Sequence, residues 1–196
     1  MGRYHIHFKR QSGLTACTGL RHSPTPMSAA VLSIGTELTR GELVNTNASW
    51  LGEELTKLGF DVTEHATVDD DLDRIVTIMR RFSDTHRVVV ATGGLGPTSD
   101  DLTTEAAAQA AGVALRRDDN VVEGIRQKFF AFGRVMPESN AKQGDFPEGA
   151  DILPNRMGTA PGFAMTLGRA RFFFVPGVPR EMKHIFESSI LAEIAP

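Results

Sequence analysis

Three glycines lie within four residues of the segment ATGGLGPTSDD, residues 91–101. Because Gly93, Gly94 and Gly96 lack side chains, the backbone can approach a ligand closely, and the amides that follow converge on a helix N-terminus that favours anions. The segment predicts a phosphate-binding loop in which Gly94 either adopts a positive φ or lies against a phosphate. The alternative is that the glycines only form a tight turn. The candidate ligand contacts here are Thr92, Gly93, Gly94, Gly96, Pro97, Thr98 and Ser99.

Two adjacent carboxylates, Asp100 and Asp101, end this segment. Capping of the following helix explains one of them well and the second poorly. Beside an anion site the pair would repel phosphate unless a divalent ion lay between them, and magnesium binds phosphate and one or two carboxylates together. The pair therefore predicts a site for a divalent cation, either magnesium or a transition metal.

A second polar loop, which contains GTEL at 35–38 and NTN at 45–47, follows the first predicted strand. Glu37 can ligate a metal or accept a hydrogen bond from a ribose hydroxyl, and Gly35, Thr36, Asn45 and Asn47 are candidate contacts beside it. The alternative is that Glu37 is a solvated loop acid and that an asparagine caps the next helix.

Two more loops of small residues lie near the C-terminal end, at 155–163 and 174–182. A Pro-Gly-x-Pro turn that opens a helix can present amides to a second phosphate or to a base, although a rigid strand-to-helix turn explains it equally well. The candidate contacts in these loops are Gly158, Thr159, Pro161, Gly162, Pro176, Gly177 and Pro179.

Alternating strand and helix patterns must position these loops. Short apolar or alternating runs predict strands, and apolar residues at helical spacing predict the helices between them. Three such units in a row predict a parallel sheet flanked by helices, with ligands at the carboxyl ends of its strands. The predicted strands are 30–34, 60–66 and 87–92, and the predicted helices run from 48 to 58, from 72 to 82 and from 102 to 111.

The second half of the chain is less regular. A helix is predicted over 120–132, with Val121, Ile125 and Phe129 or Phe130 inside. Frequent Gly and Pro predict loops over 133–163. A hairpin of strands 163–167 and 170–175 and a helix from Glu181 follow. We expect one domain over 28–196, preceded by a disordered leader over 1–27 that is dispensable for stability and activity.

Charge and composition exclude several classes of protein. The formal net charge is −3, and the first 27 residues hold four of the 21 Lys and Arg residues but no acid, so the predicted domain is more acidic still. Such a chain does not have the basic face that duplex nucleic acid requires, and no apolar run is long enough to span a membrane. Cys17 is the one cysteine, so we expect no disulfide framework and a cytoplasmic location.

The motifs together resemble one family. The chain is similar to the N-terminal domain of the competence/damage-inducible protein CinA family, within the molybdopterin-binding fold shared with MoaB, MogA and MoeA. The resemblance covers about residues 29–194. It rests on GTEL, NTN, TGGLGPTSDD, Asn140 with Lys142 and Gln143, GTAPG at 158–162 and VPGVPREM at 175–182.

This resemblance implies a three-layer α/β/α fold, often assembled into a homo-oligomer. For the CinA branch it implies divalent-metal-dependent hydrolysis of nucleotide pyrophosphates such as ADP-ribose. Molybdopterin enzymes tend to have GGTG where this chain has GGLG, which favours the pyrophosphatase branch. The alternatives are pterin binding or adenylyl transfer in molybdenum-cofactor assembly, and a non-catalytic nucleotide-binding module.

The expected roles follow from these loops. Asp100, Asp101 and Glu37 would position the divalent ion across two phosphates, and water would attack one phosphorus. The glycine backbone would hold the other phosphate. The hydroxyls of Thr98 and Ser99 and the ammonium of Lys142 would neutralise developing charge.

Overall fold

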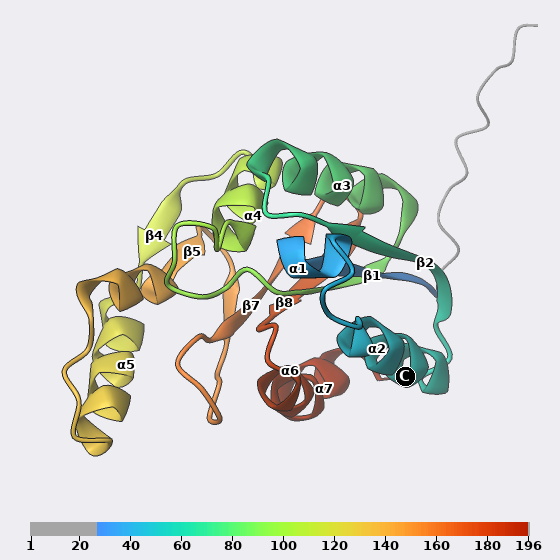
Figure 1. The fold of residues 1–196 in the computed structure, drawn as a ribbon. Helices are drawn as coiled ribbons and strands as arrows, with labels where there is room; N and C mark the ends of the chain where they lie inside the picture. The colour runs from blue at the N-terminus through green and yellow to red at the C-terminus, as the bar shows by residue number, and fades with distance from the viewer. Residues whose placement is uncertain (1–26, 196) are drawn as a thin grey trace, which may run out of the picture.

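A six-stranded sheet forms the centre of the molecule in the computed structural model, which describes residues 27–195 (Figure 1). Its strand order is β2-β1-β3-β8-β7-β6. The first four of these strands are parallel to one another, whereas β7 is antiparallel to both β8 and β6. The predicted, mostly parallel sheet is thus confirmed. The strands are β1 (Ser28–Ile34), β2 (Asp61–Val68), β3 (Val88–Thr92), β6 (Asp151–Leu153), β7 (Gly162–Leu167) and β8 (Ala170–Val175).

Helices cover both faces of this sheet and give the expected three layers (Figure 1). Successive strand residues point to opposite faces, so Val89 and Ala91 pack in one apolar core, and Val88 and Val90 pack in the other. The first core is closed by α3 (Leu72–Thr85) and α4 (Thr103–Ala111). The second is closed by α2 (Thr46–Lys57), α6 (Pro179–Ile185) and the π-helical turn Phe186–Ile190 that leads into α7 (Leu191–Ile194).

Three predicted helix ends are confirmed by their capping groups. The Asn45 side chain accepts a hydrogen bond from the Ala48 N–H at 3.1 Å and starts α2. The Asp71 side chain does the same for the Arg74 N–H at 3.0 Å and starts α3. Gly112 ends α4 with a φ of 71°, a left-handed conformation that suits glycine.

Several short elements were not predicted. They are α1 (Thr36–Thr39), the two-stranded sheet of β4 (Leu115–Arg117) and β5 (Asp145–Pro147), strand β6, and the 3₁₀ helix η1 (Glu138–Gly144). The predicted loop region 133–163 is therefore wrong in part. Elements of three or four residues are too short to show a period, and β4 and β5 are held by tertiary contacts such as the ion pair of Arg117 with Asp145 at 2.7 Å.

Helix α5 (Asp119–Ala131) was predicted correctly in place, and of the two alternatives Phe129 and Phe130 it is Phe129 that faces inward. Val122 and Ile125 are buried, Val121 and Phe129 are half-buried, and Phe130 is 81% exposed. Figure 1 shows α5 at the margin of the molecule, where it packs against η1. Because neighbouring elements cover α5 on one side only, an apolar side chain such as that of Phe130 stays exposed.

The predicted leader over residues 1–27 lies outside the described residues except for Met27. No helix in the described part of the chain combines the length and the apolar character that crossing a membrane requires.

Candidate functional site

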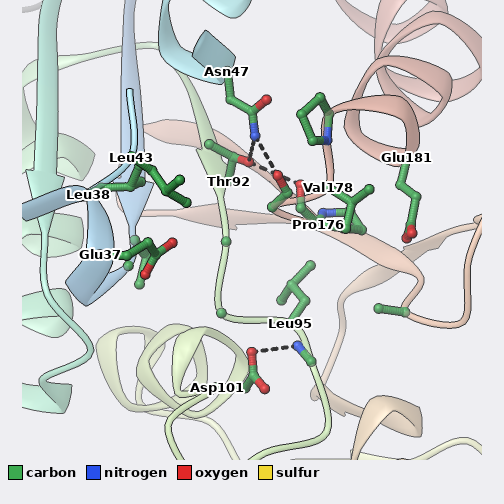
Figure 2. A pocket seen from close by; sticks show the side chains of 18 of the residues that line it. Glu37, Leu38, Leu43, Asn47, Thr92, Leu95, Asp101, Pro176, Val178 and Glu181 are labelled. Atoms are coloured by element: carbon green, nitrogen blue, oxygen red, sulfur yellow. Dashed lines mark hydrogen bonds between the residues drawn. The ribbon is translucent and has the colours of Figure 1, made fainter. Parts of the chain in front are cut away.

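A cavity of about 590 Å³ opens at the carboxyl ends of β1, β3 and β8, where the parallel sheet was expected to place a ligand (Figure 2). It brings together residues from all of the predicted loops. The predicted site residues that line it are Gly35, Glu37, Asn45, Asn47, Thr92, Gly93, Gly94, Gly96, Asp100, Asp101, Thr159, Pro176, Gly177 and Pro179.

Some predicted site residues do not line the cavity, and some residues that line it were not predicted. Thr36, Pro97, Thr98, Ser99, Lys142, Gly158, Pro161 and Gly162 were predicted but do not line the cavity. Most of the missed residues are apolar or lie far along the chain from the polar motifs, so residue type alone did not mark them. They are Ile34, Leu38, Leu43, Val44, Thr46, Asp70, Leu95, Gln143, Ala160, Val178 and Glu181.

The glycine loop is shaped by the protein around it. Gly93 and Gly94 have φ values of 106° and 65°, so the positive φ expected at Gly94 is confirmed. A Cβ on Gly93 would lie 2.1 Å from the Ile34 carbonyl oxygen, and a Cβ on Gly94 would lie 2.2 Å from Oγ1 of Thr103. Thr103 in turn donates from Oγ1 to the Gly93 carbonyl at 2.8 Å. The loop therefore needs both glycines for its own conformation.

Asp101 fixes the backbone of the same loop. Its carboxylate accepts from the N–H of Gly96 at 2.8 Å and from the N–H of Thr98 at 2.9 Å, and also from the Thr98 hydroxyl. Lys142 donates to the carbonyls of Thr98 and Asp101 at 2.9 and 2.7 Å. These bonds give Asp101 and Lys142 a structural role at the edge of the cavity, whereas Asp100 is exposed beside them.

Asn47 connects three loops at the other end of the cavity. Its Nδ2 donates to the Gly177 carbonyl at 2.7 Å and to Oγ1 of Thr92 at 3.3 Å. The Thr92 hydroxyl donates to the Pro176 carbonyl at 3.1 Å. The start of α2, the end of β3 and the β8–α6 turn are thereby held together, as Figure 2 shows.

Asp70 was missed because it lies far along the chain from the other polar motifs. Its Oδ2 accepts from the Thr36 N–H at 2.8 Å, and Oγ1 of Thr36 accepts from the Asp70 N–H at 3.2 Å. Thr36, a predicted ligand contact, is thus occupied in joining α1 to the loop before α3. This pairing brings the Asp70 carboxylate to the cavity wall.

A buried amide holds Glu181 at the cavity wall. Asn155, which is 4% exposed, donates to Oε2 of Glu181 at 2.6 Å and to the Ala160 carbonyl at 2.8 Å. Lys128 donates to the carbonyls of Asn155 and Gly158 at 2.6 and 2.8 Å, and burial lowers the pKa of its ammonium. The carboxylate of Glu181 occupies the space that a side chain at Gly158 would need. A side chain at Gly158 would therefore displace the Glu181 carboxylate from this position.

All charged side chains that line the cavity are acidic: Glu37, Asp70, Asp100, Asp101 and Glu181. No Lys or Arg is among the lining residues. Within residues 27–195, no three His, Cys, Asp or Glu side chains come together in a group that could hold a metal ion by themselves. The chemistry of the donors still suits a hard cation, since Mg²⁺ commonly takes one or two carboxylates and completes its shell with phosphates and waters.

Comparison with known sequences identifies relatives over most of this domain. The family model of the probable molybdopterin binding domain matches residues 30–195. A CinA-like protein of Frankia casuarinae is 47% identical over 173 residues, which cover 86% of this chain and 40% of the relative. A putative competence-damage inducible protein of Desulforamulus reducens is 39% identical, over 85% of this chain and 40% of the relative. The chain thus spans about 40% of the length of these two relatives.

Solved structures share the fold. The protein CinA from Thermoplasma acidophilum, described as of unknown function, matches with a TM-score of 0.78 and 35% identity, covering 86% of this chain and 98% of that one. The molybdopterin biosynthesis enzyme MoaB from Thermus thermophilus matches with a TM-score of 0.58 and 20% identity, covering 87% of this chain and 92% of that one. The second similarity supports the fold alone.

Proposed function

The chain belongs to the probable molybdopterin binding domain family and, within it, to the CinA group, and we propose that its cavity binds a small phosphorylated heterocycle, either a pterin or a nucleotide, together with a divalent cation. The observation that carries this proposal is the charge of the lining. Five carboxylates and no Lys or Arg surround a glycine loop at the end of a parallel strand. An anionic ligand is repelled there unless a cation accompanies it.

The backbone of the glycine loop supplies donors for a phosphate. Within the described residues, the N–H groups of Gly94 and Leu95 have no hydrogen-bond partner in the protein, whereas the N–H groups of Gly96 and Thr98 bond to Asp101. Gly94 and Leu95 both line the cavity. Unpaired amides beside acidic side chains suit a phosphate that shares a cation with those acids.

Asp100 is the best candidate to hold that cation, with Glu37 as a second ligand. Asp100 is exposed at the cavity, and the carboxylate of Asp101 is already engaged by the loop backbone. A bound divalent cation would neutralise the phosphates and polarise them toward attack by water. Because the cation would neutralise the phosphates, the site would need no Lys or Arg for that purpose.

Hydrolysis of a nucleotide pyrophosphate such as ADP-ribose is the second and finer proposal. It is favoured by the carboxylates of Glu37 and Asp100, which line the same cavity as the glycine loop and could share a cation with two linked phosphates. Pterin binding without turnover is favoured by the family to which the chain belongs.

The experiment combines binding and turnover on the full chain. Thermal melts are recorded with ADP-ribose and with GMP, whose guanine shares an amino-oxo-pyrimidine ring with pterins, each with and without MgCl₂. AMP release from ADP-ribose is followed by chromatography. Cation-dependent stabilisation supports the binding function, and AMP release supports hydrolysis in addition. The same measurements are made on Asp100→Asn. Its control is Asp84→Asn, which changes an exposed acid away from the cavity. If no ligand stabilised the protein with or without the metal, the binding proposal would be wrong.

A further inference from the structure

Three large apolar side chains are exposed on the rim of the cavity. Leu43 is 59% exposed, Val44 is 86% exposed and Val178 is 50% exposed. A single exposed apolar residue needs no explanation, but three around one cavity mouth form a surface that a flat apolar group could cover.

One hydrogen bond joins the two segments that carry these side chains. Leu43 and Val44 lie just before the start of α2, and Val178 follows Gly177 in the β8–α6 turn. The 2.7 Å bond from Asn47 to the Gly177 carbonyl brings the two segments together. Figure 2 shows Asn47 at one end of the cavity and Asp101 at the other. The apolar rim and the phosphate loop thus occupy different parts of one site.

Asn47 also carries a polar atom that lacks a partner. The Gly177 carbonyl can only accept a hydrogen bond, so the atom that faces it must be Nδ2 of Asn47, which fixes the orientation of the amide. The two N–H hydrogens of Nδ2 serve Gly177 and Thr92. The Oδ1 atom is buried and has no partner among the described residues. Figure 2 shows it turned away from Thr92.

Two other buried side-chain atoms without a partner are found in the described chain, Oγ of Ser33 and Nε2 of His184, and neither residue lines the cavity. Buried acceptors without a partner are rare in folded proteins because each loses its hydrogen bond to water. Asn47 is the one of these three residues that lines the cavity, and a ligand that supplies a donor would explain its unpartnered oxygen.

We propose that the heterocycle of the ligand binds between Leu43 or Val44 and Val178, gives a ring or amino N–H to Oδ1 of Asn47, and extends its phosphates toward residues 93–96. This inference rests on the proposed function and adds the direction in which the ligand lies. Because Oδ1 is shielded from water, the side chains that cover it must move for the donor to reach it.

The test compares ligands with and without a heterocycle. Affinities of AMP, GMP and ribose 5-phosphate are measured by calorimetry in MgCl₂ for the full chain and for Val178→Ser and Asn47→Ala. Each variant should weaken AMP and GMP by about tenfold, the loss expected for one apolar or hydrogen-bonded contact, and should leave ribose 5-phosphate within about twofold. In the unmodified protein, purine riboside 5′-monophosphate, whose base has no N–H donor, should bind more weakly than AMP.

Val135→Ser and Ser33→Ala are the controls. Val135 is 91% exposed but away from the cavity, and Ser33 carries a buried unpartnered oxygen without lining the cavity, so neither substitution should change any affinity. Equal losses for AMP and ribose 5-phosphate would place a sugar or phosphate at this end and overturn the inference, as would unchanged affinities. The purine riboside comparison decides the role of the donor if Asn47→Ala does not fold. Failure of all three ligands to bind the unmodified protein would instead overturn the proposed function, and this inference with it.

Discussion

The carboxylate of Asp101 holds the backbone of Gly96, with Oδ1 2.8 Å from the Gly96 nitrogen. The other carboxylate oxygen bonds to Thr98, and Lys142 closes the same loop from outside. Since Asp101 accepts hydrogen bonds from several groups of the loop, its main role is to position the loop. The two adjacent aspartates, Asp100 and Asp101, could not be distinguished by sequence, and they have different roles in the structure.

Substitution of the two aspartates should separate these roles. Asp101→Ala leaves the N–H groups of Gly96 and Thr98 without their acceptor, so the free energy of unfolding should fall by about 1–3 kcal/mol. Asp100→Asn changes an exposed side chain and should alter stability by less than about 0.5 kcal/mol while weakening cation-dependent ligand binding. Urea unfolding and ligand-induced thermal shifts of both variants test this. Equal stability of the two variants would contradict the assignment.

Gly94→Ala should destabilise the protein whether or not a ligand is present. The added Cβ would meet Oγ1 of Thr103 at 2.2 Å, in addition to the strain of a positive φ, so we expect a loss of about 2–4 kcal/mol. Gly133→Ala is the matched control, because Gly133 has a similar φ of 68° and open space around its Cβ position. Its cost should be about 1 kcal/mol. Similar melting temperatures for the two variants would show that Thr103 does not restrict this site.

Lys142→Met should lower stability more than a surface substitution does. The ammonium of Lys142 donates to two carbonyls, and the variant would leave both without this donor, at a cost of about 1–2 kcal/mol. Lys183→Met, on the exposed side of α6, provides the comparison. If Lys142→Met kept full stability and lost only turnover, a direct role in neutralising the ligand would be indicated instead.

The sequence predicted the layers of this fold well because the long elements show clear periods. Within the predicted strand 87–92 the β-branched run 88–90 is buried, and within the predicted helix 72–82 Ile75, Met79 and Phe82 are buried. The sequence did not predict β4, β5 and η1, because these short elements are held by ion pairs and turns that no local sequence pattern shows. For α5 the sequence left open whether Phe129 or Phe130 faces inward, since an apolar side chain does not reveal whether a neighbour covers it.

The candidate site was predicted in outline and not in detail. Glycine spacing and parallel-strand topology placed the loop 92–101 at the cavity correctly. Asp70 and Glu181 escaped notice because their places depend on Thr36 and Asn155, which are far away along the chain. The structural roles of Asp101 and Lys142 could not be predicted, because the sequence does not show whether a charged loop residue contacts a ligand or the backbone of its own loop.

Stability should fall with acidification because of His86. This residue is 3% exposed, and burial lowers the pKa of its imidazole. The unfolded chain then binds a proton near pH 6.5 that the folded protein takes up only at lower pH, so stability is complete above that range and is lost as the pH falls through the folded pKa. Urea unfolding at pH 7.5 and 5.5 should show this loss. The loss should be smaller in His86→Gln, and an equal loss in the variant would assign it to other groups.

Calorimetric titration of ADP-ribose into the full chain, with and without MgCl₂, tests the central claim most directly. The account predicts binding with MgCl₂ and little or none after chelation, because the charged side chains of the cavity are acidic. Asp100→Asn should reduce the effect of the metal, and Asp84→Asn should leave it unchanged. Binding of equal affinity in the presence and absence of the metal, or no binding in either condition, would contradict the account.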